Sequence, residues 1–504
     1  MSRLRNNVIA NYANQIYTSI IGITLLPLYI SHMGSESYGL IAFFTMLQAW
    51  LSLLDAGLSA TIIRETARYR SGNLSEDMYI KLYRALKSIF WLVGLVSGFI
   101  LFISSEIISS KWLNAVILPE NDILFSLKIM AASVAIRWIS GLYRGVVTGA
   151  ERLVLLSCVN SFIATLRFVI VFFTMSIFGF EVKVFFIHQL IVVLLELLVL
   201  MWFSHLIRIE MKPIMPIHGT LSLSFHDIIK FSLTIAVTSS IWLLVTQIDK
   251  LILSGILSLS DYGGFVLVAL VANTVMVIST PISSAIMPRM TKLCASGELD
   301  SMFKIYRNST QVVSVICGTA SIVLAFLAKP FLYTWTGDLS LAEEFHQVLA
   351  LYALGNSFLL VSAFPYYLQY SIGNLKLHLI GNLGMFFLLV PAIVVASKEY
   401  GALGAAWVWF SINLVYFFLW VTYVHEKIKK GLHKIWIKED IMPIYCSVVL
   451  SMFIFSFINF DNLSRIESLI AIAFQSIIAI FTAVLSSSFC RGWISNRIVF
   501  EHGK

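Results

Sequence analysis

Two arginines inside an apolar stretch are the first residues of this sequence that could do chemistry. Arg137 and Arg144 lie in the stretch 123–149. If it is a helix, they lie two turns apart on one face, about 10 Å along its axis. No acidic side chain of this helix lies near them, and a guanidinium matches a phosphate in shape and charge. The pair therefore predicts a phosphate-bearing ligand, unless both side chains extend to the cytoplasmic headgroups.

Arg167 and Glu196 form a second candidate pair, near the middles of the apolar stretches 153–178 and 184–206. At equal depth in neighbouring helices they can pair, which leaves open a purely structural ion pair. Asp55 lies in a polar stripe with helical spacing, and it is either a partner for one of the arginines or a group that binds a proton or cation. The stripe is Thr45, Gln48, Ser52, Asp55 and Ser59.

Asp249 and Lys250 lie side by side in the stretch "WLLVTQIDKLILS". Each charge costs about 2.5–3.5 kcal/mol in a membrane helix. Adjacent helical residues do not face each other, so they do not pair well. One interpretation is that Lys250 points into a cavity while Asp249 reaches another basic group. The alternative is that both side chains extend to the periplasmic interface.

The composition predicts the elements that must position these groups. The chain has 504 residues, of which 59% are hydrophobic and only 12% are charged, against about 25% charged in soluble domains. We expect an all-α polytopic membrane protein with about fourteen transmembrane helices. The predicted helices are 8–31, 38–63, 88–108, 123–149, 153–178, 184–206, 228–256, 263–287, 311–332, 345–372, 377–397, 402–424, 442–460 and 466–489.

The distribution of basic residues orients these helices with both termini in the cytoplasm. Only five Lys and Arg residues then lie in external segments: Lys111, Lys183, Lys329, Lys398 and Arg465. Basic residues are scattered over many loops, so they do not predict nucleic-acid binding. The five cysteines have no CxxC spacing, the ten histidines are dispersed, and no HExxH or Walker A motif occurs. We therefore expect no metal or cofactor.

The sequence repeats at an offset of about 224 residues. "LYISHMGSESYGLIAFF" from Leu28 matches "LILSGILSLSDYGGFVL" from Leu251, and Arg64 and Arg289 follow at equivalent places. The offset spans six predicted helices, so both halves keep one orientation, as in parallel-repeat transporters. We predict two pseudo-symmetric six-helix lobes around a central cavity, 1–210 and 211–430. Residues 431–504 then form two extra helices and a cytoplasmic tail.

Two stretches resemble the bacterial O-antigen and polysaccharide flippases. They are "LLPLYISHMGSESYGLIAFFTMLQAWLSLLDAGLSATIIRETARYRSG" and "WLLVTQIDKLILSGILSLSDYG". The resemblance is to the Wzx-like branch of the polysaccharide transporter family, within the multidrug/oligosaccharidyl-lipid/polysaccharide exporter (MOP) superfamily. It implies a non-enzymatic protein of the bacterial inner membrane. Such a protein flips an undecaprenyl-diphosphate-linked oligosaccharide by alternating access, in contact with membrane lipid and with other polysaccharide assembly proteins.

The resemblance and the polar stripes together give a hypothesis for the site. Basic residues hold the diphosphate: Arg64, Arg137, Arg144, Arg167, Lys250 and Arg289. Three acids serve coupling or ion pairing: Asp55, Glu196 and Asp249. Two rival functions stay open, a multidrug exporter of the same superfamily and a membrane polysaccharide polymerase. The first favours an acidic cavity, and the second a long external loop, which this sequence does not have.

Overall fold

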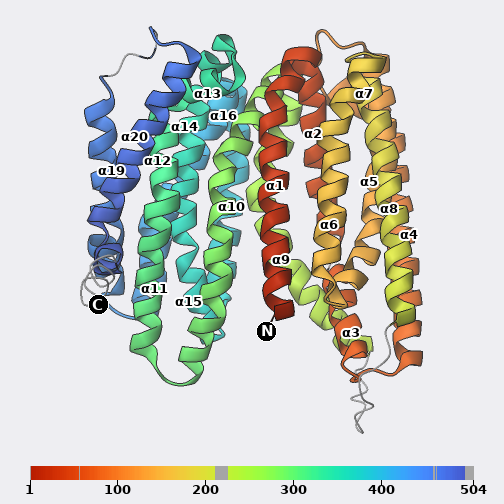
Figure 1. Cartoon of the computed structure of the whole chain (residues 1–504), viewed down its shortest axis with the longest axis horizontal. Coiled ribbons are helices and arrows are strands. Elements are labelled where there is room, and N and C mark those ends of the chain that lie inside the picture. Colours follow the sequence, from red (N-terminus) through yellow and green to blue (C-terminus); the bar gives the residue numbers. More distant parts are fainter. Residues whose placement is uncertain (1, 56, 211–224, 458–459, 461, 494–504) are drawn as a thin grey trace. The chain divides into compact units, whose positions relative to one another are not determined.

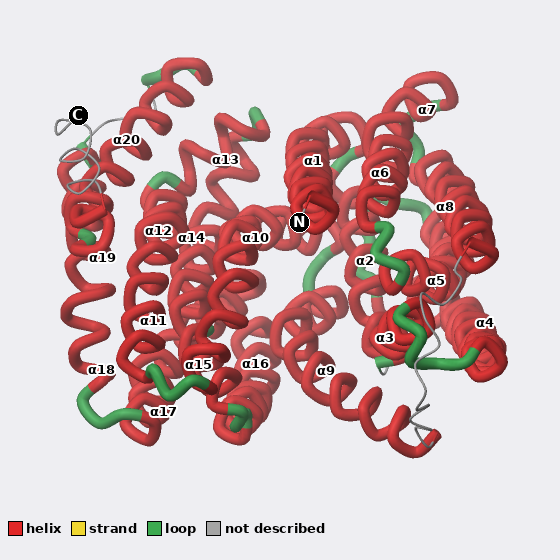
Figure 2. The backbone as a smooth tube through the Cα atoms, turned by 60° about the horizontal axis from the view of Figure 1, so that its bottom comes forward, coloured by secondary structure: helices red, strands yellow, loops and turns green. Residues whose placement is uncertain are grey.

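The computed structural model describes residues 2–55, 57–210, 225–457, 460 and 462–493. Within these residues every regular element is helical (Figures 1 and 2). Ten helical segments of this described part are long and apolar enough to cross a membrane. This confirms the predicted all-α, multi-pass class. The count of fourteen helices stays a prediction, because residues 376–428 are one of the ten segments yet hold two predicted helices.

The chain divides into two compact units, residues 1–263 and 264–504. The predicted lobe boundary at 210/211 stays a prediction, and residues 211–224 lie outside the described part. The helices of the first unit are α1 (Ser2–Met33), α2 (Ser35–Leu51), η1 (Ser52–Asp55), α3 (Leu58–Arg70), α4 (Glu76–Ile107), η2 (Ile108–Trp112), α5 (Glu120–Gly149), α6 (Leu153–Ala164), η3 (Thr165–Ile170), α7 (Val171–Phe178), α8 (Val182–Glu210) and α9 (Phe225–Ile256).

Helix α5 is the centre of the first unit and packs against α3, α4 and α8. Its glycines Gly141, Gly145 and Gly149 recur every four residues and therefore lie on one face. A Cβ at Gly145 would lie 2.3 Å from Cγ2 of Ile62 in α3. The close approach needs glycine, as expected for a small-residue packing face. It fixes where the arginines of α5 lie relative to α3.

Two predicted single helices are interrupted in the structure. The stretch 38–63 divides into α2, a 3-10 turn η1 and α3, with Gly57 at φ 75° between them. The stretch 153–178 contains the π-helix η3 around Arg167. A hydropathy pattern does not reveal such breaks, because the side chains stay apolar while the backbone hydrogen bonding changes. Both interruptions lie next to candidate site residues.

The two halves of the sequence repeat meet within residues 1–263. A Cβ at Gly39 of α2 would lie 1.9 Å from the carbonyl oxygen of Leu259, where α10 (Leu259–Ala295) begins. A Cβ at Gly263, the repeat partner of Gly39, would lie 3.0 Å from the backbone nitrogen of Gly39. Equivalent Tyr-Gly dipeptides therefore pack on each other. Their shared glycine is explained by this contact between backbones.

The second unit contains the rest of α10 and the helices that follow it. Helix α16 turns at Gly401, whose φ of 59° and ψ of −138° are not helical. The two predicted helices 377–397 and 402–424 are thus separated where predicted. The other helices are α11 (Leu299–Val313), η4 (Ser314–Gly318), α12 (Thr319–Phe326), α13 (Ala328–Thr336), α14 (Leu339–Ser362), α15 (Phe364–Ile372), α16 (Lys376–Val415), η5 (Tyr416–Trp420), α17 (Val421–Ile428), α18 (Leu432–Ile435), η6 (Trp436–Ile441), α19 (Met442–Phe455) and α20 (Arg465–Ser486).

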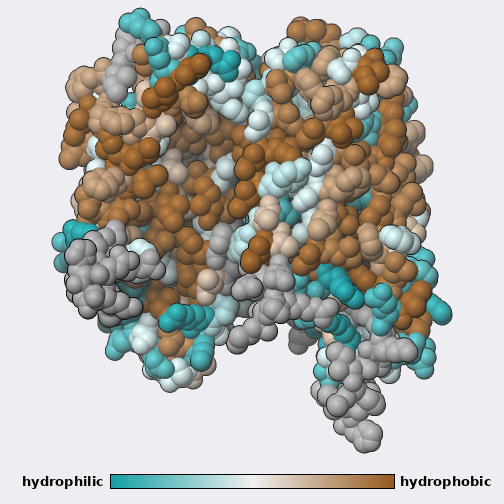
Figure 3. Space-filling view, viewed as in Figure 1, coloured by the Kyte–Doolittle hydropathy of each residue, from teal (hydrophilic) through white to brown (hydrophobic). Residues whose placement is uncertain are grey.

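Apolar residues cover much of the face seen in Figure 3, and hydrophilic residues gather near the ends of the helices. Large side chains such as Leu198, Phe387 and Phe481 are more than 60% exposed. A lipid environment removes the cost of such exposure, because the hydrocarbon core needs apolar side chains of this kind over about 30 Å.

Candidate substrate-binding cavity

Glu196 of α8 joins two arginines from different helices. Its two carboxylate oxygens accept hydrogen bonds from Arg144 of α5 and, at 3.0 Å, from Arg167 of η3. The Glu196 side chain is only 4% exposed. Arg144 also donates to Oδ1 of Asn160 at 2.8 Å. The predicted pair of Arg167 and Glu196 is present, but the expectation that Arg144 is unpaired is wrong. Glu196 neutralises it from a neighbouring helix.

Arg137 is the arginine of α5 that keeps its charge unpaired. It makes no hydrogen bond or ion pair with any described residue. It lies close enough to Arg144, Arg167 and Glu196 to interact with them electrostatically. Three guanidinium groups therefore share one carboxylate, which leaves a net charge of about +2 in the interior of the unit. An uncompensated guanidinium in such a place is costly without an anion to bind.

A polar cavity of about 580 Å³ opens beside Arg137. Four members of the predicted polar stripe line it, Gln48, Ser52, Asp55 and Ser59, together with Arg137. The stripe was predicted from helical spacing, and the structure confirms that these residues share one surface. The cavity thus combines one free cation, one carboxylate and several hydrogen-bonding groups. That set can bind a phosphate and the hydroxyl groups of a sugar.

Asp55 has a local structural role at the edge of this cavity. Its Oδ1 accepts hydrogen bonds from the backbone N–H of Ser59 at 3.1 Å and from the Ser59 hydroxyl at 2.7 Å. These bonds satisfy a free N–H at the start of α3 in the manner of a cap. No ion pair joins Asp55 to an arginine among the described residues. The interpretation of Asp55 as the partner of an arginine is therefore wrong.

The π-helix η3 presents Arg167 to Glu196. A π-turn leaves carbonyl groups out of the regular ladder, and side chains of α8 bind them. Gln189 donates to the carbonyl of Arg167, and a ring nitrogen of His188 lies 2.9 Å from that of Leu166. Sequence reasoning missed these supports. The only available signal was the polar character of two adjacent residues in an apolar helix.

Lys250 bends back along α9. Its Nζ donates to Oε1 of Gln247 at 3.0 Å and lies 3.4 Å from the carbonyl of Thr246. Both partners lie one turn toward the N-terminus, the opposite direction from the predicted periplasmic end. Asp249 is 2% exposed and accepts from the backbone N–H of Lys250. The alternative in which both extend to the periplasmic interface is therefore wrong for Lys250.

Arg64 and Arg289 do not line the cavity. Arg64 lies 2.7 Å from Glu65 of α3, which also pairs with Arg68 at 3.0 Å. Arg289 lies on α10 in the second unit and is exposed. The structure therefore brings Arg137, Arg144, Arg167, Glu196 and Asp55 together and leaves these two elsewhere. Their predicted role rested on sequence position alone.

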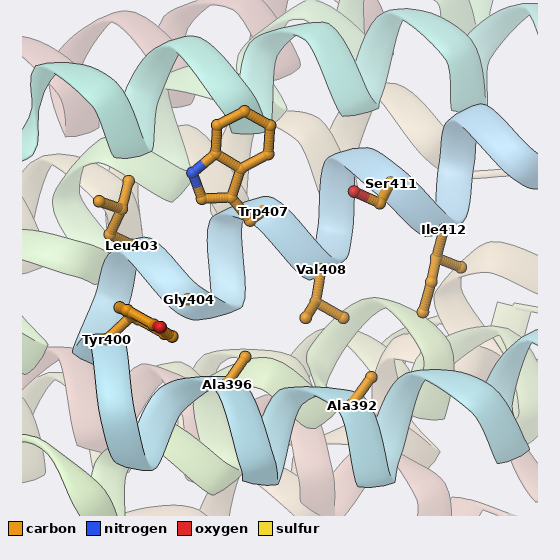
Figure 4. Close-up of a pocket in the computed structure, with 9 residues that line it drawn as sticks. All are labelled: Ala392, Ala396, Tyr400, Leu403, Gly404, Trp407, Val408, Ser411 and Ile412. Carbon is orange, nitrogen blue, oxygen red and sulfur yellow. The ribbon is translucent and has the colours of Figure 1, made fainter.

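A second cavity, in the second unit, has no charged lining residue. It is a groove of about 490 Å³ between the two arms of α16. Figure 4 shows Ala392 and Ala396 on one arm, facing Val408 and Ile412 on the other. This surface suits a hydrocarbon chain and cannot hold a phosphate. A third described cavity, of about 480 Å³ and also in the second unit, is polar as well, with Arg307, Lys429 and Asp440 among its lining residues, but Arg307 there is paired with Asp440.

Comparison with known proteins identifies the family of this chain. The model of the polysaccharide biosynthesis protein family matches residues 4–294, more than half of the sequence. The chain belongs to this family. A member from Shigella flexneri, named "Putative O-antigen transporter", is 21% identical over 419 residues, covering 82% of this chain and 96% of that protein. The resemblance predicted from the sequence is confirmed.

Two solved structures show the fold of this family member. "Lipid II flippase MurJ, inward closed conformation" has a TM-score of 0.71 at 13% identity and covers 97% of this chain and 99% of that one. An inward-facing multidrug resistance transporter of the MATE family has a TM-score of 0.64 at 12% identity, covering 82% and 96%. At these identities the likeness shows a shared MurJ/MATE-like fold. It does not choose between their substrates.

Proposed function

We propose that this family member flips a diphosphate-linked lipid oligosaccharide, an O-antigen or related repeat unit on undecaprenol. The direction is from the cytoplasmic to the periplasmic leaflet of the bacterial inner membrane, with both termini in the cytoplasm. The protein is a transporter and forms no covalent intermediate with its cargo. Its partners are this lipid-linked substrate, the surrounding lipid and other proteins of polysaccharide assembly.

The observation that carries this proposal is Arg137, an unpaired cation on the wall of a polar cavity. A diphosphate supplies the missing negative charge and several acceptor oxygens. Arg144 and Arg167 add positive field but are partly neutralised by Glu196. The hydroxyl and amide groups of Gln48, Ser52 and Ser59 can bind sugar hydroxyls. The lipid tail stays in the bilayer, so no free energy is needed to transfer it out of hydrocarbon.

The remaining predicted residues take secondary parts in the proposal. Lys250, Arg64 and Arg289 contact the diphosphate at other stages of the alternating-access cycle. Glu196 is already bound by two arginines, so it serves to hold them. Asp55 lies on the cavity wall without a cationic partner among the described residues, and it is the acid we assign to coupling. Asp249 positions the last turns of α9.

Export of organic cations is the alternative, since a MATE transporter has a similar fold. A cation exporter needs an uncompensated acid in its cavity, because a cationic guest must replace its hydration. Here the one acid among the lining residues, Asp55, shares the cavity wall with Arg137, and Arg144 and Arg167 add positive charge nearby that Glu196 neutralises in part. The relative named as an O-antigen transporter also favours the lipid-linked sugar.

Reconstitution into liposomes tests this function. The protein is mixed with an undecaprenyl-diphosphate oligosaccharide, and an impermeant sugar-modifying reagent scores the outer leaflet. We expect leaflet exchange above empty liposomes without nucleotide. Replacing Arg137 by Ala should slow this exchange at least tenfold, about 1.4 kcal/mol, without lowering the unfolding temperature, since no native bond is lost.

Lys128 provides the matched control for Arg137. It lies on the same helix, and its Nζ lies 5.4 Å from the ring of Phe102, away from the cavity. Lys128→Ala should keep the exchange rate of the wild type. Equal losses in both variants would show that any charge on α5 matters only for folding. No exchange with a matched glycan would reject the flippase function.

A further inference from the structure

Four side chains in the second unit form one continuous hydrogen-bonded chain. Oη of Tyr306 on α11 lies 2.6 Å from Nε2 of His425 on α17. Nδ1 of His425 lies 3.0 Å from Nδ1 of His433 on α18, and Nε2 of His433 lies 2.8 Å from Oγ1 of Thr422. The Thr422 hydroxyl donates to the carbonyl of Phe418 in η5. The chain joins three helices that are separate in the sequence.

The bonding pattern assigns the protons of this chain when both histidines are neutral. Thr422 has one hydroxyl proton, and the carbonyl of Phe418 takes it, so Nε2 of His433 must donate to Thr422. A neutral His433 then accepts at Nδ1, and Nδ1 of His425 must be the donor. Nε2 of His425 is left as an acceptor for the Tyr306 hydroxyl. The two histidines are therefore opposite tautomers, and all bonds run one way.

The chain is shielded from water. Tyr306 and His425 are fully buried, and His433 is 9% exposed. The ring of Trp436 packs against both histidines, with centroids 4.8 Å from His425 and 5.9 Å from His433. Burial lowers the pKa of His433 because a cation is poorly solvated there, while Glu426 opposes this shift. The neutral chain is thus the resting form.

We propose that this chain is the proton-binding site that couples transport to a proton gradient. This inference rests on the proposed transport function and names its coupling ion and second-lobe site. An excess proton has one place to go, because the facing Nδ1 atoms share a single proton in the neutral chain. Uptake of one more proton reverses the two hydrogen bonds made by His425 in turn, so the site is a relay.

The step conserves atoms and charge. When helix movement in the transport cycle opens the Tyr306 end to water, a hydronium ion gives its proton to Oη of Tyr306, whose own hydroxyl proton moves to Nε2 of His425. The proton on Nδ1 of His425 passes to Nδ1 of His433. Tyr306 and His425 end neutral, water is released, and the positive charge rests on His433. Glu426 of α17 is the carboxylate that acts on that charge.

Charged groups on the neighbouring elements connect the relay to the last helices. Asp440 of η6 acts electrostatically on Tyr306 and is bound by Arg307 at 2.7 Å and by Gln311 at 2.7 Å. Gln311 also accepts from the backbone N–H of Phe489, just beyond α20. Helix α15 adds tyrosines but no charge, and Lys434 of α18 is exposed. A change in the orientation of the Tyr306 hydroxyl therefore acts electrostatically on Asp440. Asp440 is bonded to Gln311, which in turn bonds the segment just beyond α20.

Nuclear magnetic resonance of the purified protein with ¹⁵N-labelled histidine tests the relay without transport. At neutral pH we expect one Nδ1–H tautomer that disappears in His425→Gln and one Nε2–H tautomer that disappears in His433→Gln. On acidification, one resonance should take the imidazolium shift, and it should be that of His433. Two Nε2–H tautomers, or simultaneous protonation of both rings, would overturn the assignment.

Liposomes with an imposed proton gradient test the coupling. We expect the gradient to accelerate leaflet exchange by the wild type, and His433→Gln to abolish that acceleration while exchange without a gradient persists. His346→Gln is the matched control, because His346 bonds only the carbonyl of Glu343 in its own helix. Acceleration that survives in both His425→Gln and His433→Gln rejects this inference alone. Absence of any exchange by the wild type would instead reject the proposed function.

Discussion

The two units treat polar side chains inside their helices differently. In the first unit, Arg144 and Arg167 share the carboxylate of Glu196. In the second unit, Asn356 of α14 takes the central position instead. Its amide donates to Asn273 at 2.9 Å, and its carbonyl accepts from Trp409 at 3.0 Å. The cluster of the first unit carries excess positive charge, whereas this amide network of the second unit is neutral, and the buried Asp440 there is paired with Arg307.

This difference indicates that the two units have different roles. A neutral amide network costs little to bury when every bond is made, and it holds helices together. A cluster with more cations than anions costs free energy in every empty protein. Packing alone would not explain it, so we interpret the first unit as the part that handles the anionic headgroup. Three substitutions test the comparison.

Replacing Glu196 by Ala should have the largest effect. It leaves Arg144 and Arg167 without their counter-ion, and breaking a buried ion pair costs about 3–5 kcal/mol. We expect a clear loss of folded protein and a lower unfolding temperature in detergent. The double variant Arg167→Leu/Glu196→Leu should recover part of the lost stability. No recovery would contradict the electrostatic origin of the cost.

Replacing Asn356 by Leu should have an intermediate effect. Trp409 and Asn273 then lose their partner, and an unsatisfied buried polar group costs about 1–3 kcal/mol. The unfolding temperature measures this, and leaflet exchange per folded molecule should not change. Asn413→Leu is the control, because Asn413 only donates to a carbonyl of its own helix. A specific loss of exchange in Asn356→Leu would contradict these different roles.

Replacing Asp55 by Asn should change stability least. The amide oxygen of Asn can still accept from the backbone N–H of Ser59, and exchanging one good cap for another costs only a few tenths of a kcal/mol. Any change in the cation dependence of transport then reports the lost charge alone. Asp55→Ala should cost about 1 kcal/mol more, through the lost cap. Identical transport in Asp55→Asn would remove Asp55 from coupling.

Sequence reasoning found the residues of the first-unit site but not all of their pairings. Helical spacing placed Gln48, Ser52 and Asp55 on one face, and the cavity confirms it. Sequence reasoning left Arg144 unpaired because it considered the acidic residues of the same helix alone. Glu196 is 52 residues away in sequence, and which helices become neighbours is a property of packing. The histidine chain was missed for the same reason, because Tyr306 is 119 residues from His425.

The sequence by itself determined the membrane class, the helical periodicity, the internal repeat and the family. These follow from composition and local order, because a helix in lipid must satisfy its own backbone and present apolar side chains. Only the tertiary structure decided which cation is free. Arg137 and Arg144 have the same chemistry and share a helix face, yet Glu196 reaches one of them alone. Their difference is set by the helix packed beside each, because electrostatic pairing acts through space and falls off with distance.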